Sequence, residues 1–154
     1  MTSTPATVTV ILDRIHEINQ LLTGYTAKRY FPQAFDTALM PMLIPTFGAN
    51  QRSKPSEDTR VNKRTFAIIG VCGQFMQGTP TESAQKIAEQ MVTDIEELYD
   101  ARNRLQLDGN DAPDFINHFD YDADTGLTVY PNTDLAVVLF TTTVESDRYV
   151  IETL

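Results

Sequence analysis

Apolar residues recur at intervals of three and four near the start of the chain, which is the period of a helix with one buried side. This pattern predicts a helix from about Pro5 to Leu22. Thr4 can cap its first turn, Pro5 suits that turn because no backbone N–H is needed there, and Gly24 ends the helix. Polar residues fill the opposite side, so we expect His16 to lie at the surface.

Between Tyr25 and Phe47 the apolar residues follow no clean period, and three prolines restrict any helix to a couple of turns. The segment from Leu39 to Phe47 is consistent with a strand that contains Pro41 and Pro45. Proline cannot donate to a strand ladder, which confines such a strand to a sheet edge or a bulge. We expect this edge to be available to a neighbouring subunit.

Residues 48–62 have no apolar side chain between Ala49 and Val61, so they cannot contribute to a core. They are predicted to form a long flexible loop, and loops of this length are usually functional or disordered. The basic residues of the loop and of the two positions after it are Arg52, Lys54, Arg60, Lys63 and Arg64. We expect the loop to become ordered against a partner; a solvated hairpin tip is the simpler alternative.

The residues from Lys63 to Phe75 are rich in β-branched and aromatic side chains, and their unbroken apolar middle is typical of a strand covered on both faces. This strand is expected to be central in the sheet. Gly70 and Gly73 indicate bends or bulges, because neither G-x-x-x-x-G-K-S/T nor G-x-G-x-x-G occurs in the chain. Cys72, the single cysteine, is expected to be an inert core thiol.

A second helix is predicted from Pro80 to about Arg104. Thr79 is placed as its cap and Glu82 as the partner in a capping box, and an apolar stripe follows. This helix should be the main core element. The residues expected to pack together are Ile87, Met91, Ile95 and Leu98 from the helix, with Phe66, Ile68, Val137 and Leu139 from the sheet.

The remainder of the chain alternates strand-like runs with turn residues. The predicted strands are Phe115 to Tyr121, Leu127 to Tyr130, Leu135 to Val144 and Arg148 to Glu152, the last two being separated by a turn at residues 145–147. These would be consecutive antiparallel strands. The whole chain, 1–154, is thus expected to form a single α+β domain, with an antiparallel or mixed β-sheet packed against two α-helices.

The net charge is −9 and it is unevenly divided. Residues 1–64 carry eight basic and five acidic side chains, whereas residues 65–154 carry four basic and sixteen acidic ones. This balance disfavours general binding to nucleic acid, which depends on clustered Lys and Arg. The unlike regions suit contacts between copies of the chain, and a solvated acidic surface without a partner is the simpler alternative. The apolar runs are too short to span a membrane, and no secretory signal is expected.

Candidate chemistry is sparse. Asp120, Asp122 and Asp124 alternate as in a calcium-binding loop, but Thr125 replaces the required glycine and Pro131 the bidentate glutamate. An acidic sheet edge, with the three carboxylates on one face, is therefore expected, with no metal or cofactor. The two histidines lack a recognisable nucleophile nearby in the sequence, so no enzymatic activity is predicted.

The order of these elements resembles the tail terminator proteins of long-tailed bacteriophages over nearly the whole chain. The segments that carry the resemblance are Met40 to Pro45, Arg64 to Val71, Thr79 to Leu105 and Asp134 to Val144. It implies a hexameric ring that caps the major tail tube protein, stops polymerisation of the tube and joins it to a head-completion or stopper protein. DNA would pass through the lumen without specific binding. The protein would be assembled in the bacterial cytoplasm and end in the virion, at the junction of tail and neck.

A ring subunit needs heterologous contacts, in which one surface meets a different surface of the next copy. The residues expected at subunit or partner contacts are Arg52, Lys54, Arg60, Lys63, Arg64, Met40, Pro41, Met42, Asp120, Asp122, Asp124 and Asp134. The apolar and proline-bearing edge from Leu39 to Pro45 should supply most of the binding energy, because exposed ion pairs contribute little. The alternatives are another phage neck or head-completion adaptor and a small α+β enzyme or ligand-binding domain.

Overall fold

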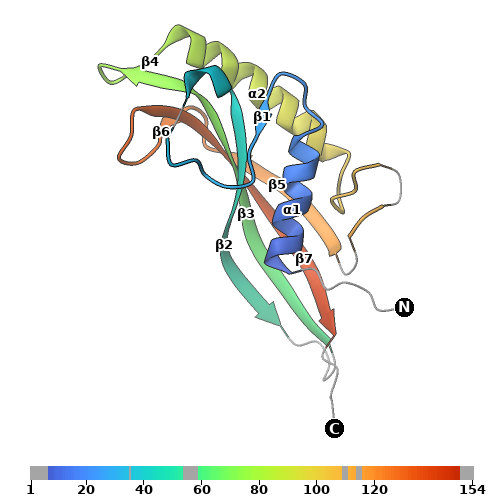
Figure 1. The fold of residues 1–154 in the computed structure, drawn as a ribbon. Coiled ribbons are helices and arrows are strands. Elements are labelled where there is room, and N and C mark those ends of the chain that lie inside the picture. Colours follow the sequence, from blue (N-terminus) through green and yellow to red (C-terminus); the bar gives the residue numbers. More distant parts are fainter. Residues whose placement is uncertain (1–6, 35, 54–58, 109–110, 114–115, 150–154) are drawn as a thin grey trace.

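The computed structural model describes residues 7–34, 36–53, 59–108, 111–113 and 116–149. In these residues the fold is α+β, with a curled mixed sheet and two α-helices (Figure 1). The elements in chain order are α1 (Val8–Asn19), β1 (Thr26–Ala27), a 3-10 turn η1 (Thr37–Leu39), β2 (Met42–Ser53), β3 (Thr59–Met76), β4 (Thr79–Pro80), α2 (Glu82–Asp100), β5 (Ile116–Asp124), β6 (Thr128–Val129) and β7 (Leu135–Tyr149).

The first helix is confirmed, but its start differs from the prediction. Thr7 is the N-cap, and its side chain accepts a hydrogen bond from the Val10 backbone N–H at 3.2 Å. Thr4 and Pro5 lie outside the described residues. His16 is half-buried, not simply at the surface. Burial and the nearby Arg29 guanidinium lower the pKa of His16 from its usual 6.5.

The predicted cap of the second helix was wrong by two residues. Thr81 is the N-cap and accepts from Ala84 N–H at 3.2 Å. Thr79 belongs to the short strand β4, because left-handed backbone at Gln77 and Gly78 folds the chain back onto the end of β3. The helix also ends before the predicted Arg104, at Asp100.

The strand β3 is central, as predicted, and lies antiparallel between β2 and β7 in the order β1-β2-β3-β7-β5. The expected series of consecutive strands is wrong, because β5 and β6 both pair with β7, at different points along it. The turn predicted at residues 145–147 is also absent from the described chain. There β7 continues to Tyr149, with Val144 and Ser146 buried.

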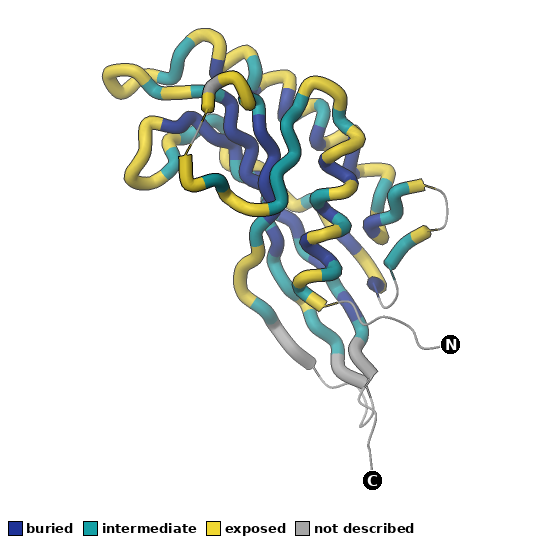
Figure 2. The backbone as a smooth tube through the Cα atoms, in the orientation of Figure 1, coloured by how far each residue is buried: buried dark blue, intermediate teal, exposed yellow. Residues whose placement is uncertain are grey.

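The prediction of a flexible loop over residues 48–62 is wrong at both ends. Strand β2 continues to Ser53 and β3 begins at Thr59, and Asn50 pairs with Arg64 and Ser53 with Val61. Residues 54–58, including Lys54, lie outside the described residues. A ladder of backbone hydrogen bonds needs no apolar side chains, so residues 47–50 and 61–65 extend the hairpin although none of them is buried (Figure 2).

Both helices pack on the same face of the sheet and share one core. Its largest buried members are Tyr99, Phe66, Phe140, Ile15, Ile18, Leu43, Ile68, Met91, Ile95 and Leu105. Gly70 lets α2 approach, since a Cβ there would collide with Met91. Val137 and Leu139, predicted under the helix, instead lie on the opposite face with Met42 and Ile44, because the β7 residues that face the helices are Ala136, Val138 and Phe140.

Candidate interface at the edge of strand β2

The outer side of β2 is paired over only a small part of its length. Strand β1 pairs with Met42 and Leu43, and the pairing ends where Lys28 N–H donates to the Leu43 carbonyl at 2.9 Å. From there to Ser53, no described strand covers this side of β2. Every second residue of a strand directs its backbone groups to the same side, so Pro45 and Phe47 share the outward direction of Leu43. The edge therefore offers carbonyls at both positions but an N–H only at Phe47.

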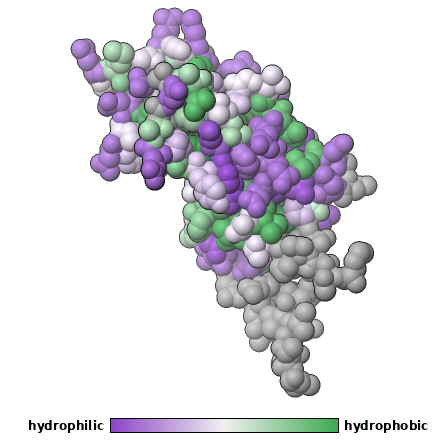
Figure 3. Space-filling view, viewed as in Figure 1, coloured by the Kyte–Doolittle hydropathy of each residue, from purple (hydrophilic) through white to green (hydrophobic). Residues whose placement is uncertain are grey.

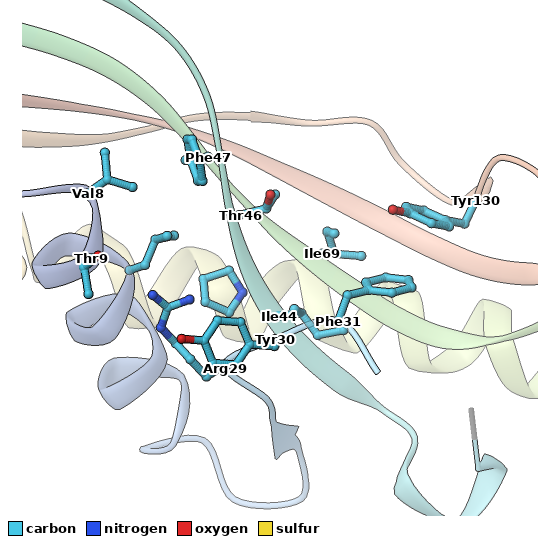
Figure 4. A pocket seen from close by; sticks show the side chains of 12 residues that line it. Val8, Thr9, Arg29, Tyr30, Phe31, Ile44, Thr46, Phe47, Ile69 and Tyr130 are labelled. Carbon is cyan, nitrogen blue, oxygen red and sulfur yellow. The ribbon is translucent and has the colours of Figure 1, made fainter. Parts of the chain in front are cut away.

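A groove of about 470 Å³ follows this edge. Figure 4 shows Val8 and Thr9 of α1 on one side of β2, with Ile69 and Tyr130 on the other. The Phe31 and Tyr130 rings stack with their centroids 4.9 Å apart. In Figure 3, hydrophobic residues gather near the start of α1 and the adjacent β2, on a largely hydrophilic surface.

Aromatic side chains around the groove are unusually exposed. Tyr30 is 74% exposed, Phe47 54% and Phe31 37%. Single exposed apolar residues are normal on a protein surface, whereas a contiguous group of them marks an interaction site. We call this surface the β2-edge groove and define it by Arg29, Tyr30, Phe31, Phe47, Arg64 and Tyr130.

Two arginines border the β2-edge groove, and only one of them is paired with a described carboxylate. The Arg29 Nε lies 2.7 Å from Asp13 Oδ1, and its guanidinium carbon is 4.7 Å from the Tyr30 ring centroid. Arg64 donates to the Gly48 carbonyl at 3.0 Å and lies 5.7 Å from the Phe47 ring centroid. No described carboxylate is within ion-pair distance of Arg64. Its positive charge is thus available to a partner.

The opposite edge of the sheet is acidic, but the carboxylates do not share one face as predicted. A bulge at Asp122 shifts the register, so that Asp120 lies opposite Thr143 and Asp124 lies opposite the core residue Phe140. Asp122 accepts a hydrogen bond of 2.6 Å from the Thr143 hydroxyl. The bulge therefore turns Asp124 towards the helix side of the sheet.

Carboxylates of α2 extend this acidic surface. The pKa of the Tyr121 hydroxyl is raised, first by burial and then by the charges of Asp124, Glu96 and Asp100. The Tyr121 hydroxyl donates to Asp124 Oδ2 at 3.4 Å, and α2, which carries Glu96 and Asp100, contacts β5. We call Glu96, Asp100, Asp120, Asp122 and Asp124 the acidic edge.

The backbone of the acidic edge is partly covered by the chain itself. Phe119 N–H donates to the Asn103 carbonyl at 2.7 Å, and Arg104 Nε donates to the Ile116 carbonyl at 3.0 Å. The register of β5 also shifts twice in nine residues. Bulges and charged side chains are common ways of preventing strand pairing at a sheet edge.

The predicted contact residues differ in how exposed they are and in where they lie. Met42 is fully buried, and Met40 and Pro41 are half-buried, so this group offers less surface than the sequence suggested. Lys63 and Asp134 are exposed, whereas Arg64 is half-buried beside Phe47. Arg52 and Arg60 belong to the hairpin strands β2 and β3.

Sequence reasoning missed Arg29, Tyr30 and Phe31 because the segment after Tyr25 has no period. Their signal was the adjacent pair of aromatic residues in a polar, irregular stretch. It also missed Glu96 and Asp100, which lie outside the apolar stripe of the predicted helix.

Three further features are the thiol of Cys72, the grouping of metal-binding side chains and the apolar length of the helices. Cys72 is buried 3.8 Å from the Met91 sulfur, and burial raises the pKa of its thiol to about 12. Within the described ranges, no three His, Cys, Asp or Glu side chains are grouped so that they could hold a metal ion. The described helices include none that is long and apolar enough to cross a membrane.

Comparison with known proteins gave no match, either among protein-family models or among curated proteins.

Proposed function

We propose that this chain is a tail terminator, a structural protein of a long-tailed bacteriophage. Its copies form a hexameric ring that caps the tail tube, ends polymerisation of the tube and joins it to a head-completion or stopper protein. The observation that supports this proposal is the difference between the two edges of the sheet. One edge is aromatic and carries Arg29 and Arg64, and the other is acidic. Unlike surfaces on opposite sides of a subunit suit the heterologous contacts from which rings are built.

The order of elements adds support from the sequence, since it is the basis of the resemblance to this family. The net charge of −9 is compatible with a ring through which DNA passes without being bound. The proposed location is the junction of tail and neck in the virion, after assembly in the bacterial cytoplasm.

A tube-capping experiment tests this function. The purified protein is added to the polymerising tail tube protein of the same phage, and the products are examined by electron microscopy. We expect shorter tubes with ring-shaped density at one end. The control is an unrelated protein of similar size and net charge. Tubes of unchanged length without end density would contradict the proposal, and binding to the head connector instead of the tube would indicate a neck adaptor.

The size of the β2-edge groove favours a second candidate, a small ligand-binding domain. A volume of about 470 Å³ is within the range of small-molecule sites, and aromatic linings are common in them. A ligand that binds the folded state raises the melting temperature. Two results together would support this candidate. The protein should be a stable monomer whose melting temperature rises when a small molecule is added, and Tyr30→Ala should abolish that rise.

A further inference from the structure

We infer that the β2-edge groove is the docking surface for a second copy of the chain, which presents its acidic edge to it. This inference rests on the proposed function, because it assigns the two surfaces that meet between neighbouring ring subunits. The occupant is a copy of this chain, and not a small ligand or another protein.

The apolar part of the groove indicates a macromolecular contact. Tyr30 and Phe47 lie on the same side of the subunit as the uncovered part of β2, and both are more than half exposed. Buried aromatic side chains dominate the energy of protein interfaces, and Arg is enriched beside them. Covering these rings with a partner would remove from water the two most exposed aromatic side chains among the described residues.

Charge identifies the partner surface. Two copies that met through the same groove would place both Arg64 guanidiniums in one contact, where no described carboxylate pairs with either of them, and like-charge repulsion disfavours this. The acidic edge has the opposite sign, and it lies at the other side of the sheet, beyond β3 and β7. A subunit cannot fold it back onto its own groove. The complementary contact is therefore between different copies and is heterologous.

The backbone of β2 adds a directional element. The outward backbone N–H of Phe47 can donate a hydrogen bond to a carboxylate of the neighbouring subunit, whereas Pro45 has no backbone N–H to donate. The bulges of β5 and its cover at Asn103 do not favour continuous strand pairing. We therefore expect a contact made mainly by side chains.

Two surface variants and their mixture test the inference by native mass spectrometry. Phe47→Asp disables the groove, and the double variant Glu96→Lys, Asp100→Lys disables the acidic edge. Each variant alone should be monomeric, with self-association weakened by about 30-fold or more, as expected for loss of an interface hot spot. An equimolar mixture should give a heterodimer with one copy of each variant and nothing larger, because each pair contains a single intact contact.

Matched controls separate this result from misfolding or a general effect of charge. Met76→Asp changes a residue that is 66% exposed and lies away from the groove, at the end of β3. Glu82→Lys, Glu89→Lys makes the same charge change in the first half of α2. Both controls should form rings like the unmodified protein, and circular dichroism should show that all variants are folded.

Three outcomes would overturn the inference. If both surface variants still form rings, the ring contact lies elsewhere, and the proposed function stands without this assignment. If each is monomeric but the mixture gives no heterodimer, the two surfaces do not meet each other. If the unmodified protein is monomeric at every concentration, no second copy occupies the groove, and the tube-capping experiment then decides the proposed function separately.

Discussion

Strand β5 forms one edge of the sheet and β2 most of the other, and the two strands differ in how far their outward backbone groups are covered. Asn103 and Arg104 cover part of β5, and two register shifts interrupt its edge. Strand β2 is paired by β1 at two residues only, and its obstacles to a further strand are Pro45 and one register shift, between Phe47 and Asn50. The two edges thus differ in protection, although both lie in the same sheet.

A phenylalanine on each edge strand shows the same difference. Phe119 on β5 is 2% exposed and packs on Tyr99 with a ring separation of 5.4 Å, whereas Phe47 on β2 is 54% exposed. Unprotected edges invite aggregation, so proteins usually block them. An edge left open beside exposed aromatic residues is the arrangement that the proposed contact between copies requires.

The largest expected effect is the difference in stability between the two alanine variants of these phenylalanines. Phe119→Ala should lower the free energy of unfolding by about 3 to 5 kcal/mol, because it leaves a cavity in the core. Phe47→Ala should change it by no more than about 0.5 kcal/mol in the isolated subunit. Urea unfolding of both variants measures the difference. Equal losses would mean that Phe47 is already packed in the monomer, and the comparison of the edges would fail.

Two arginines that bind edge-strand carbonyls provide a second, smaller test. Arg104→Met should cost about 1 to 3 kcal/mol, because it leaves the carbonyl of the buried residue Ile116 without its donor. Arg64→Met should cost less, since water can replace the guanidinium at the exposed Gly48 carbonyl. Chemical denaturation of the monomeric forms measures both. A greater loss for Arg64→Met would show that β2, and not β5, depends on its arginine.

The sequence predicted the parts of the fold that depend on local periodicity. Both helices, the central strand and the α+β class follow from the spacing of apolar residues. The start of α2 was misplaced because Thr79 and Thr81 are equally good caps in isolation, and only the pairing of β4 with β3 distinguishes them. The polar end of the β2–β3 hairpin was missed because its ladder is formed by backbone groups.

The candidate site was less predictable because it is assembled from distant segments. Tyr130 follows β6, yet its ring stacks on Phe31. The bulge at Asp122 separates Asp124 from Asp120, and nothing in the alternating pattern of aspartates reveals it. Pairing between strands sets their register and their bulges, and these determine which face of the sheet a side chain occupies. Sequence periodicity alone therefore assigns some side chains to the wrong face.

The cap of α2 offers a third test, because this helix carries Glu96 and Asp100 of the acidic edge. Thr81→Ala should lower the free energy of unfolding by about 1 kcal/mol through loss of its bond to Ala84 N–H. Thr79→Ala is the matched control and should have almost no effect, since Thr79 is exposed in β4. Thermal unfolding of both variants checks this. The reverse order would place the start of the helix two residues earlier.

The smallest expected effect is a dependence of stability on pH that comes from His16, which lies near Arg29 of the β2-edge groove. His16 is half-buried on α1, and burial and the Arg29 guanidinium lower its pKa from 6.5. The folded state therefore binds fewer protons than the unfolded state below about pH 7, so stability should fall as the pH decreases through 6.5 towards the lowered pKa. His16→Gln should remove this part of the decrease in melting temperature. NMR titration of a His118→Gln variant, in which His16 is the remaining histidine, gives the pKa directly. A value above 6.5 would reverse the sign and show that the Asp13 and Glu17 carboxylates act on His16 more strongly than burial and Arg29.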